Sequence, residues 1–174
     1  EQALFEDDSS YFMDLYVMDA DGTNVQQLTR SPGYDGGPFF SPDGSKITWR
    51  RFNPDGNSAE IWTMDADGSN QRQLTADAMV AWAPYYHPSG EYLIYSSNQL
   101  GHANFELFLI DTQGAHAPVR VTNTDGTDIL PVFSPSGDQL AWSTTRTPDG
   151  TSQLHIADWN HARALELLAN SSAH

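Results

Sequence analysis

Cysteine, basic residues and long hydrophobic stretches are all scarce in this sequence. The chain of 174 residues has no cysteine, which excludes disulfide bonds and thiolate chemistry. Only 8 lysines and arginines stand against 23 aspartates and glutamates, giving a net charge of −15. That balance offers no basic patch for nucleic acid or for an anionic membrane surface. No apolar run approaches the ~18 residues of a membrane span, so neither nucleic-acid binding nor membrane insertion is expected.

Common catalytic and metal-binding motifs are missing as well. The sequence contains no G-x-S-x-G nucleophile motif and no histidine pair at H-x-x-x-H or H-E-x-x-H spacing. Asp19, Asp21 and Asn24 resemble the start of a calcium loop, but the downstream bidentate glutamate is absent, which favours a hairpin turn. We therefore expect no enzyme activity, no metal site and no cofactor. Turn chemistry and solubility explain the acid excess, with a cationic partner or metal ions as the alternative.

What the sequence does contain is a phrase repeated three times. It reads SPDGSKITW from Ser41, HPSGEYLIY from His87 and SPSGDQLAW from Ser134, at spacings of 46 and 47 residues. The proline and glycine favour a tight hairpin turn, and the β-branched and aromatic residues that follow favour a strand. Each copy of the phrase therefore predicts a pair of antiparallel strands.

A second phrase keeps the same period. Its copies YVMDADG, WTMDADG, FLIDTQG and HIAD share one aspartate at the same repeat position, and three segments close in Leu-Thr or Val-Thr. The four aspartates are Asp19, Asp65, Asp111 and Asp158. Each period thus holds four strands, and periods of ~40–50 residues with four strands are typical of propeller blades. The predicted fold is an all-β propeller of four-stranded antiparallel blades, with about three and a half blades present.

The repeats also divide the chain. The predicted parts are an incomplete blade at 1–34, blades at about 35–75, 81–122 and 128–159, and a short helical tail or linker at 160–174 that begins with Asn160 as N-cap. The last blade has no recognisable fourth strand. Propellers close with 4–8 blades, so three and a half blades do not make a ring. We expect the chain, which starts at Glu1 without methionine, to be a fragment of a longer propeller; a homodimeric ring of two copies is the alternative.

The repeated phrases resemble the PD40 repeats, also known as WD40-like or TolB-like propeller repeats. The family pattern is an F-S-P-D-G hairpin, an I-Y-x-M-D-x-D-G hairpin and a closing L-T, and it covers about nine tenths of this chain. The resemblance implies a ring of six or seven blades and an exported, periplasmic or secreted protein. It implies no single activity, because such repeats occur both in periplasmic TolB and in the non-catalytic propellers of peptidases. Departures from the pattern at His87, Ser89, Ser136 and Thr112-Gln113 speak against a metal array in the turns.

Two groups of residues are candidate binding sites. The loops that enter the innermost strands open at one mouth of the propeller channel, where Asp35, Trp82 and Asp128 stand at or beside equivalent repeat positions. The competing interpretation is that Trp82 packs between blades and the aspartates cap backbone amides. A long loop of variable sequence carries His102 and Asn104, which is typical of binding loops and equally of ordinary surface loops.

Three functions fit these observations. The favoured one is a non-catalytic scaffold module for protein interactions in the bacterial cell envelope. The alternatives are the accessory propeller of an exported peptidase, whose catalytic domain lies outside this chain, and a binder of small molecules or sugars at the channel mouth. The expected partner is another protein or the remaining blades of the same propeller, and these should cover residues 11–29 and 140–158, where an open stack exposes apolar sheet faces.

Overall fold

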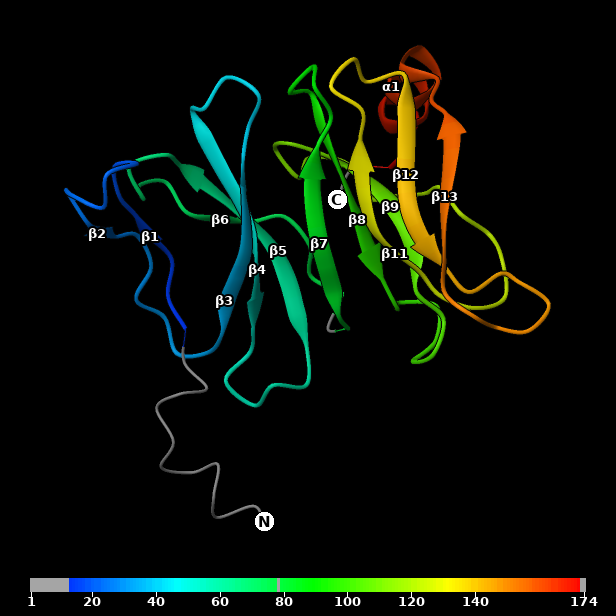
Figure 1. The fold of residues 1–174 in the computed structure, drawn as a ribbon, viewed down its shortest axis with the longest axis horizontal. Coiled ribbons are helices and arrows are strands. Elements are labelled where there is room, and N and C mark those ends of the chain that lie inside the picture. The colour runs from blue at the N-terminus through cyan, green and yellow to red at the C-terminus, as the bar shows by residue number, and fades with distance from the viewer. Residues whose placement is uncertain (1–12, 78, 173–174) are drawn as a thin grey trace.

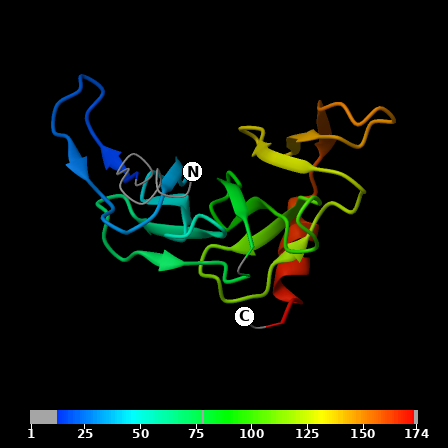
Figure 2. The same ribbon diagram turned by 90° about the horizontal axis from the view of Figure 1, so that it is seen from below.

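Antiparallel sheets make up nearly all of the regular structure. The computed structural model describes residues 13–77 and 79–172, and within them thirteen strands and one helix are formed. Four sheets stand side by side, and seen from below they follow an open arc rather than a closed ring (Figures 1 and 2). The predicted all-β propeller fold with about three and a half blades is confirmed.

The two middle sheets are complete blades. In each of them the four strands lie in chain order, and every neighbouring pair is antiparallel. The first contains β3 (Asp35–Phe40), β4 (Lys46–Phe52), β5 (Ala59–Asp65) and β6 (Arg72–Gln73). The second contains β7 (Ala81–Tyr86), β8 (Tyr92–Ser97), β9 (Glu106–Asp111) and β10 (Val119–Arg120).

The two end sheets have fewer strands in the described part of the chain. The N-terminal one pairs β1 (Tyr16–Val17) with β2 (Gln26–Gln27), and the C-terminal one joins β11 (Asp128–Phe133), β12 (Gln139–Thr144) and β13 (Gln153–Asp158). Within residues 13–77 and 79–172, β13 has β12 as its only partner. After Trp159 the chain forms α1 (His161–Ala169), with the side chain of Asn160 accepting a hydrogen bond from the amide of Arg163 at 2.9 Å. No described helix is long and apolar enough to cross a membrane.

The hairpin between β3 and β4 shows why the Ser-Pro-Asp-Gly phrase recurs. Gly44 has a φ of 72°, in the left-handed region that glycine adopts without steric cost. The carboxylate of Asp43 accepts hydrogen bonds from the Ser41 hydroxyl at 2.6 Å and from the Ser45 amide at 3.0 Å. These bonds, led by that from Ser41, lower the pKa of Asp43 to about 2, so the turn is held by an ionised carboxylate at neutral pH.

The closing threonine of each repeat ties the fourth strand to the third. The Thr122 hydroxyl accepts a hydrogen bond from the Leu107 amide at 2.9 Å and donates one to the buried carboxylate of Glu106. Glu106 also accepts a hydrogen bond from Arg120 Nη2 at 2.6 Å. Thr75 repeats the backbone contact one blade earlier. A side-chain hydroxyl thus takes over pairing where the short fourth strand ends, which explains the Leu-Thr phrase.

Helix α1 covers part of the sheet formed by β7–β10. It buries Ala164 and Leu168 in a cluster with Tyr92, Leu107 and Trp142, so it joins the second complete blade to the C-terminal sheet. Trp159 Nε1 donates a hydrogen bond to the Tyr92 hydroxyl at 2.8 Å. The helix therefore closes the gap between these two blades, while the outer edge of β13 stays open in the described structure.

Acidification is expected to destabilise the fold through His87. Burial lowers the pKa of this histidine from 6.5, and the neighbouring His161, whose ring centroid lies 4.5 Å away, lowers it further; the Gly137 carbonyl and Glu91 act in the opposite direction. The unfolded chain therefore binds the proton more readily. The stability that neutral His87 contributes is complete above about pH 6.5 and is lost as the pH falls below that value.

The test is the thermal midpoint measured between pH 7 and pH 5. It should fall with acidification in the wild type and fall less in His87→Ser, which places the residue of Ser41 and Ser134 at the equivalent position. Equal slopes for the two proteins would contradict the assignment.

Candidate functional site

The innermost strands share a β-bulge at the end where they begin. We call this end of the sheets the mouth end, and the opposite end, with the Ser-Pro-Asp-Gly hairpins, the turn end. The pairing register shifts within β3, β7 and β11. At the bulge Gly37, Ala83 and Leu130 have φ values of 62°, 51° and 57°. Ala83 and Leu130 are strained there because side chains with a Cβ disfavour this region, and such strain concentrates at functional sites.

Both candidate aspartates of the mouth are buried and paired with arginine. Asp35 is 2% exposed and binds Arg51 in a bidentate contact, Nε to Oδ1 at 2.7 Å and Nη2 to Oδ2 at 2.8 Å. Asp128 is 1% exposed and accepts from Arg146 Nη2 at 2.6 Å and from Trp142 Nε1 at 3.1 Å. The structure thus places both carboxylates inside their blades, where they join strands rather than face a ligand.

Burial opposes the ionisation of Asp128, but hydrogen bonds from Thr144 and Arg146 outweigh it and lower the pKa of this carboxyl. The sequence carried only a partial signal for these ion pairs. Asp35 lies directly opposite Arg51 in the strand register, and where the middle blade has Ala81 in place of the aspartate, its partner is Ser97. Asp128, however, lies opposite Thr144, and its arginine is two residues further on.

Trp82 is the mouth residue whose side chain stays accessible. It follows the buried Ala81 on β7 and is 36% exposed. The guanidinium carbon of Arg50 from the preceding blade lies 4.4 Å from its ring centroid, and the Phe52 ring meets it edge-on at 6.0 Å. Arg50 also lies over Tyr34, at 5.2 Å from that ring. Trp82 therefore packs between blades, as the competing interpretation holds, and still presents an aromatic surface at the mouth end.

A cavity of about 380 Å³ lies beside Trp82, between the blades of β7 and β11. It brings together Trp82 and His102, which the sequence assigned to two separate candidate sites. Asn104 is outside its lining, and the side-chain oxygen of Asn104 is buried without a hydrogen-bond partner among the described residues. The complete lining is Trp82, His102, Ala103, Phe105, Thr127, Ile129 and Leu130.

Three large apolar residues of this cavity were not among the candidate site residues of the sequence analysis: Phe105, Ile129 and Leu130. The repeat itself carried a signal for two of them. Ile129 occupies the position of Trp82 one blade later, and Leu130 occupies that of Gly37, where a bulky residue is unfavourable for the backbone. With Phe105 added by a loop, the cavity suits an apolar side chain.

The described residues contain no group of three acidic or histidine side chains arranged to hold a metal ion. The geometry of the mouth end is that of a binding surface on a rigid frame. Its accessible part is aromatic and aliphatic, and its charged groups are paired beneath.

Comparison with known proteins identifies two TolB homologues as relatives of this chain. The chain is 30% identical over 145 residues to a Protein TolB homolog of Chlorobium chlorochromatii, covering 83% of this chain and 31% of that protein. A Protein TolB homolog of Chlorobium luteolum is 29% identical over 155 residues, covering 89% and 34%. The chain thus spans about a third of the length of these curated relatives.

Solved structures agree in fold. TolB from Acinetobacter baumannii superimposes with a TM-score of 0.67 at 22% identity, covering 92% of this chain and 37% of that one. The β-propeller domain of the Trilobed protease from Pyrococcus furiosus gives 0.57 at 14%, covering 84% and 46%. The family model described as the TolB beta propeller domain matches residues 5–173, and the chain therefore belongs to the TolB β-propeller family.

Proposed function

We propose that this chain is a non-catalytic interaction module of a bacterial cell-envelope propeller and that its mouth end binds a segment of a partner protein. The observation that carries the proposal is the cavity of about 380 Å³ beside the exposed face of Trp82. Tryptophan is one of the residues most enriched at the hot spots of protein interfaces, because it adds a large contact area at little conformational cost. The kinship with TolB homologues supports a site in the periplasm.

The charges around the cavity support a partner that brings an apolar side chain. The nearby carboxylates of Asp35 and Asp128 already bind Arg51 and Arg146, so they offer no free anion to a cationic partner. Apolar atoms of Phe105 and Leu130 form much of the wall. A leucine or phenylalanine of the partner would fill this space.

Site-specific photo-crosslinking tests the proposal. A benzophenone amino acid at position 102, on the rim of the cavity, should capture a partner from periplasmic extract, whereas the same label at Phe40, near the turn end, should not. With the captured protein purified, Trp82→Ala should weaken binding by about 2 kcal/mol or more, roughly 30-fold. Phe40→Ala, which removes another exposed aromatic ring, is the matched control. Equal affinities for Trp82→Ala and wild type would refute the site.

The second candidate is an accessory propeller of an exported peptidase. Its support is the likeness in fold to the propeller domain of the Trilobed protease. The two candidates differ in what the gene encodes beyond His174. A peptidase domain there would favour the second candidate, and peptide hydrolysis by the purified 174-residue chain itself would contradict the non-catalytic role.

A further inference from the structure

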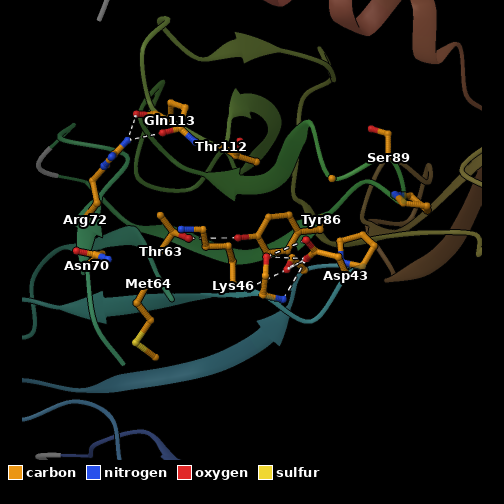
Figure 3. Close-up of a pocket in the computed structure, with 15 residues that line it drawn as sticks. Asp43, Lys46, Thr63, Met64, Asn70, Arg72, Tyr86, Ser89, Thr112 and Gln113 are labelled. Atoms are coloured by element: carbon orange, nitrogen blue, oxygen red, sulfur yellow. Dashed lines mark hydrogen bonds between the residues drawn. The ribbon is translucent and has the colours of Figure 1, made fainter. Parts of the chain in front are cut away.

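A second and larger cavity lies at the turn end. It occupies about 520 Å³ between the two complete blades, β3–β6 and β7–β10, and is bordered by the hairpins at 41–46 and 88–90 (Figure 3). Both of the blades that line this cleft have four strands in the described structure. Its position at the opposite end from Trp82 makes it independent of the proposed function.

The floor of the cleft has polar side chains at two positions where the other repeats have apolar ones. The hydroxyls of Thr63 and Tyr86 lie 3.2 Å apart, and Figure 3 shows this contact joining the two blades. At the position of Thr63 the other repeats have Val17, Leu109 and Ile156, and at the position of Tyr86 they have Phe40 and Phe133. Both hydroxyls are therefore specific to this interface and not part of the repeat's own packing.

The rim of the cleft also carries polar residues that differ from those at equivalent positions in the other repeats. Arg72 crosses from one blade to the other and donates from Nη1 to the Gln113 carbonyl at 3.1 Å and to its side-chain oxygen at 2.8 Å (Figure 3). The other repeats have Gln26 and Val119 at the position of Arg72. Lys46, which stands where other repeats have Tyr92 and Gln139, forms an ion pair with Asp65. The departures from the repeat thus gather around one cleft.

The charges in the cleft balance. Hydrogen bonds, the largest from Ser41, lower the pKa of Asp43 to about 2, and those from Lys46 and Asn70 lower the pKa of Asp65. Both carboxylates are therefore ionised at neutral pH. Asp43 lines the cleft, and Asp65, which lies outside the lining, forms an ion pair with Lys46, so together they offset the two cations Lys46 and Arg72. In a chain with a net charge of −15, this balance favours an uncharged ligand over an anion.

The neighbouring interfaces show that the cleft is not a general feature of the fold. Between β7–β10 and β11–β13 the corresponding space is filled by Trp159 and His161, which contact Tyr92. Between β1–β2 and β3–β6 the described residues leave a cavity of only about 80 Å³, with apolar walls such as Leu15 and Ile47. Of these three interfaces, one has a large polar opening.

We propose that this cleft binds a neutral sugar, as a monosaccharide or a short oligosaccharide. Sugars present hydroxyls around their rim and C–H groups on their faces. The cleft meets the hydroxyls with side chains already fixed by mutual hydrogen bonds, among them Asp43, Asn70 and Gln113. It meets the faces with the apolar surfaces of Pro42 and Pro88. Pre-ordered polar groups beside apolar walls are what small-ligand specificity requires.

The experiment is a titration of the 174-residue chain, followed by amide NMR shifts. The probes are glucose, galactose, mannose, N-acetylglucosamine, maltose and cellobiose, with inorganic phosphate and citrate as anionic arms. At least one sugar should bind with a Kd of about 1 mM or tighter. The double variant Tyr86→Phe with Arg72→Gln, which uses the chain's own residues from equivalent positions, should weaken that sugar at least ~10-fold.

The control is Trp82→Ile, which likewise borrows an equivalent residue, Ile129, at the mouth end. It should keep sugar affinity and the shifts at the cleft unchanged, and thermal melts should show all three proteins folded. Binding of phosphate or citrate alone, an equal loss in the control, unchanged affinity in the double variant, or no shifts with any sugar would each overturn the proposal.

Discussion

Replacing Asp35 by asparagine should lower the free energy of unfolding by about 3–5 kcal/mol. The side chain of Asp35 is buried and binds Arg51 through both of its oxygens. Asparagine keeps the shape but removes the charge and one acceptor, so the arginine, itself only 13% exposed, loses the anion that compensates it. The measurement is chemical denaturation of the wild type and the variant, compared by midpoint and slope.

The same change at an exposed position is the control. Asp125 lies on the surface, and Asp125→Asn should alter stability by less than about 0.5 kcal/mol. Asp35→Asn combined with Arg51→Met should recover part of the loss, since removing both partners leaves no uncompensated charge. A singly substituted protein as stable as the wild type would contradict the structural role and return Asp35 to the candidates for ligand binding.

Leu154 and Ile156 form an exposed apolar face of β13. Replacing both by lysine should weaken self-association of the chain through this face at least ~100-fold. Leu154 is 79% exposed and Ile156 68% exposed, whereas their repeat equivalents Leu107 and Leu109 are buried against the adjoining blade. Burying such a side chain contributes ~1.5–3 kcal/mol, so two of them account for the factor. Sedimentation across a range of concentrations should show self-association of the 174-residue chain and its loss in the variant.

Leu100→Lys is the matched control, because this leucine is also exposed but lies in the loop between β8 and β9 and not on β13. It should leave association unchanged. A wild-type chain that stays monomeric at every concentration would contradict the expectation that the face is covered. A clean dimer would favour pairing of two copies over the remaining blades of a longer propeller.

The number of strands in the two end sheets bears on whether two copies of the chain pair into one ring. The C-terminal sheet already has three strands, and the N-terminal sheet supplies both a third-type and a fourth-type strand, β1 and β2. Joining them directly would give five strands where a blade has four. A dimeric ring of seven four-stranded blades therefore requires β1 to be displaced. The open edge of β13 is better matched by a single added strand like β6 or β10.

The candidate sites were only partly accessible from sequence. Repeat spacing identified the mouth positions Asp35, Trp82 and Asp128, because equivalent residues recur at a fixed interval. Spacing says nothing about partners across a strand pair. The arginines that neutralise the two aspartates lie 16 and 18 residues further on, and the register of the hairpins, shifted by a bulge, decides which side chains meet.

The sequence by itself determined the local structure and the architecture. Proline and glycine at turn positions and alternating strand residues are short-range signals that are read from neighbours along the chain. The period of 46 or 47 residues is read by comparing the repeats with one another. The tertiary structure alone decided what those positions do. It buried Asp35, joined Trp82 to His102 around one cavity and opened a polar cleft above Thr63 and Tyr86, because the packing of blade on blade sets which side chains remain accessible.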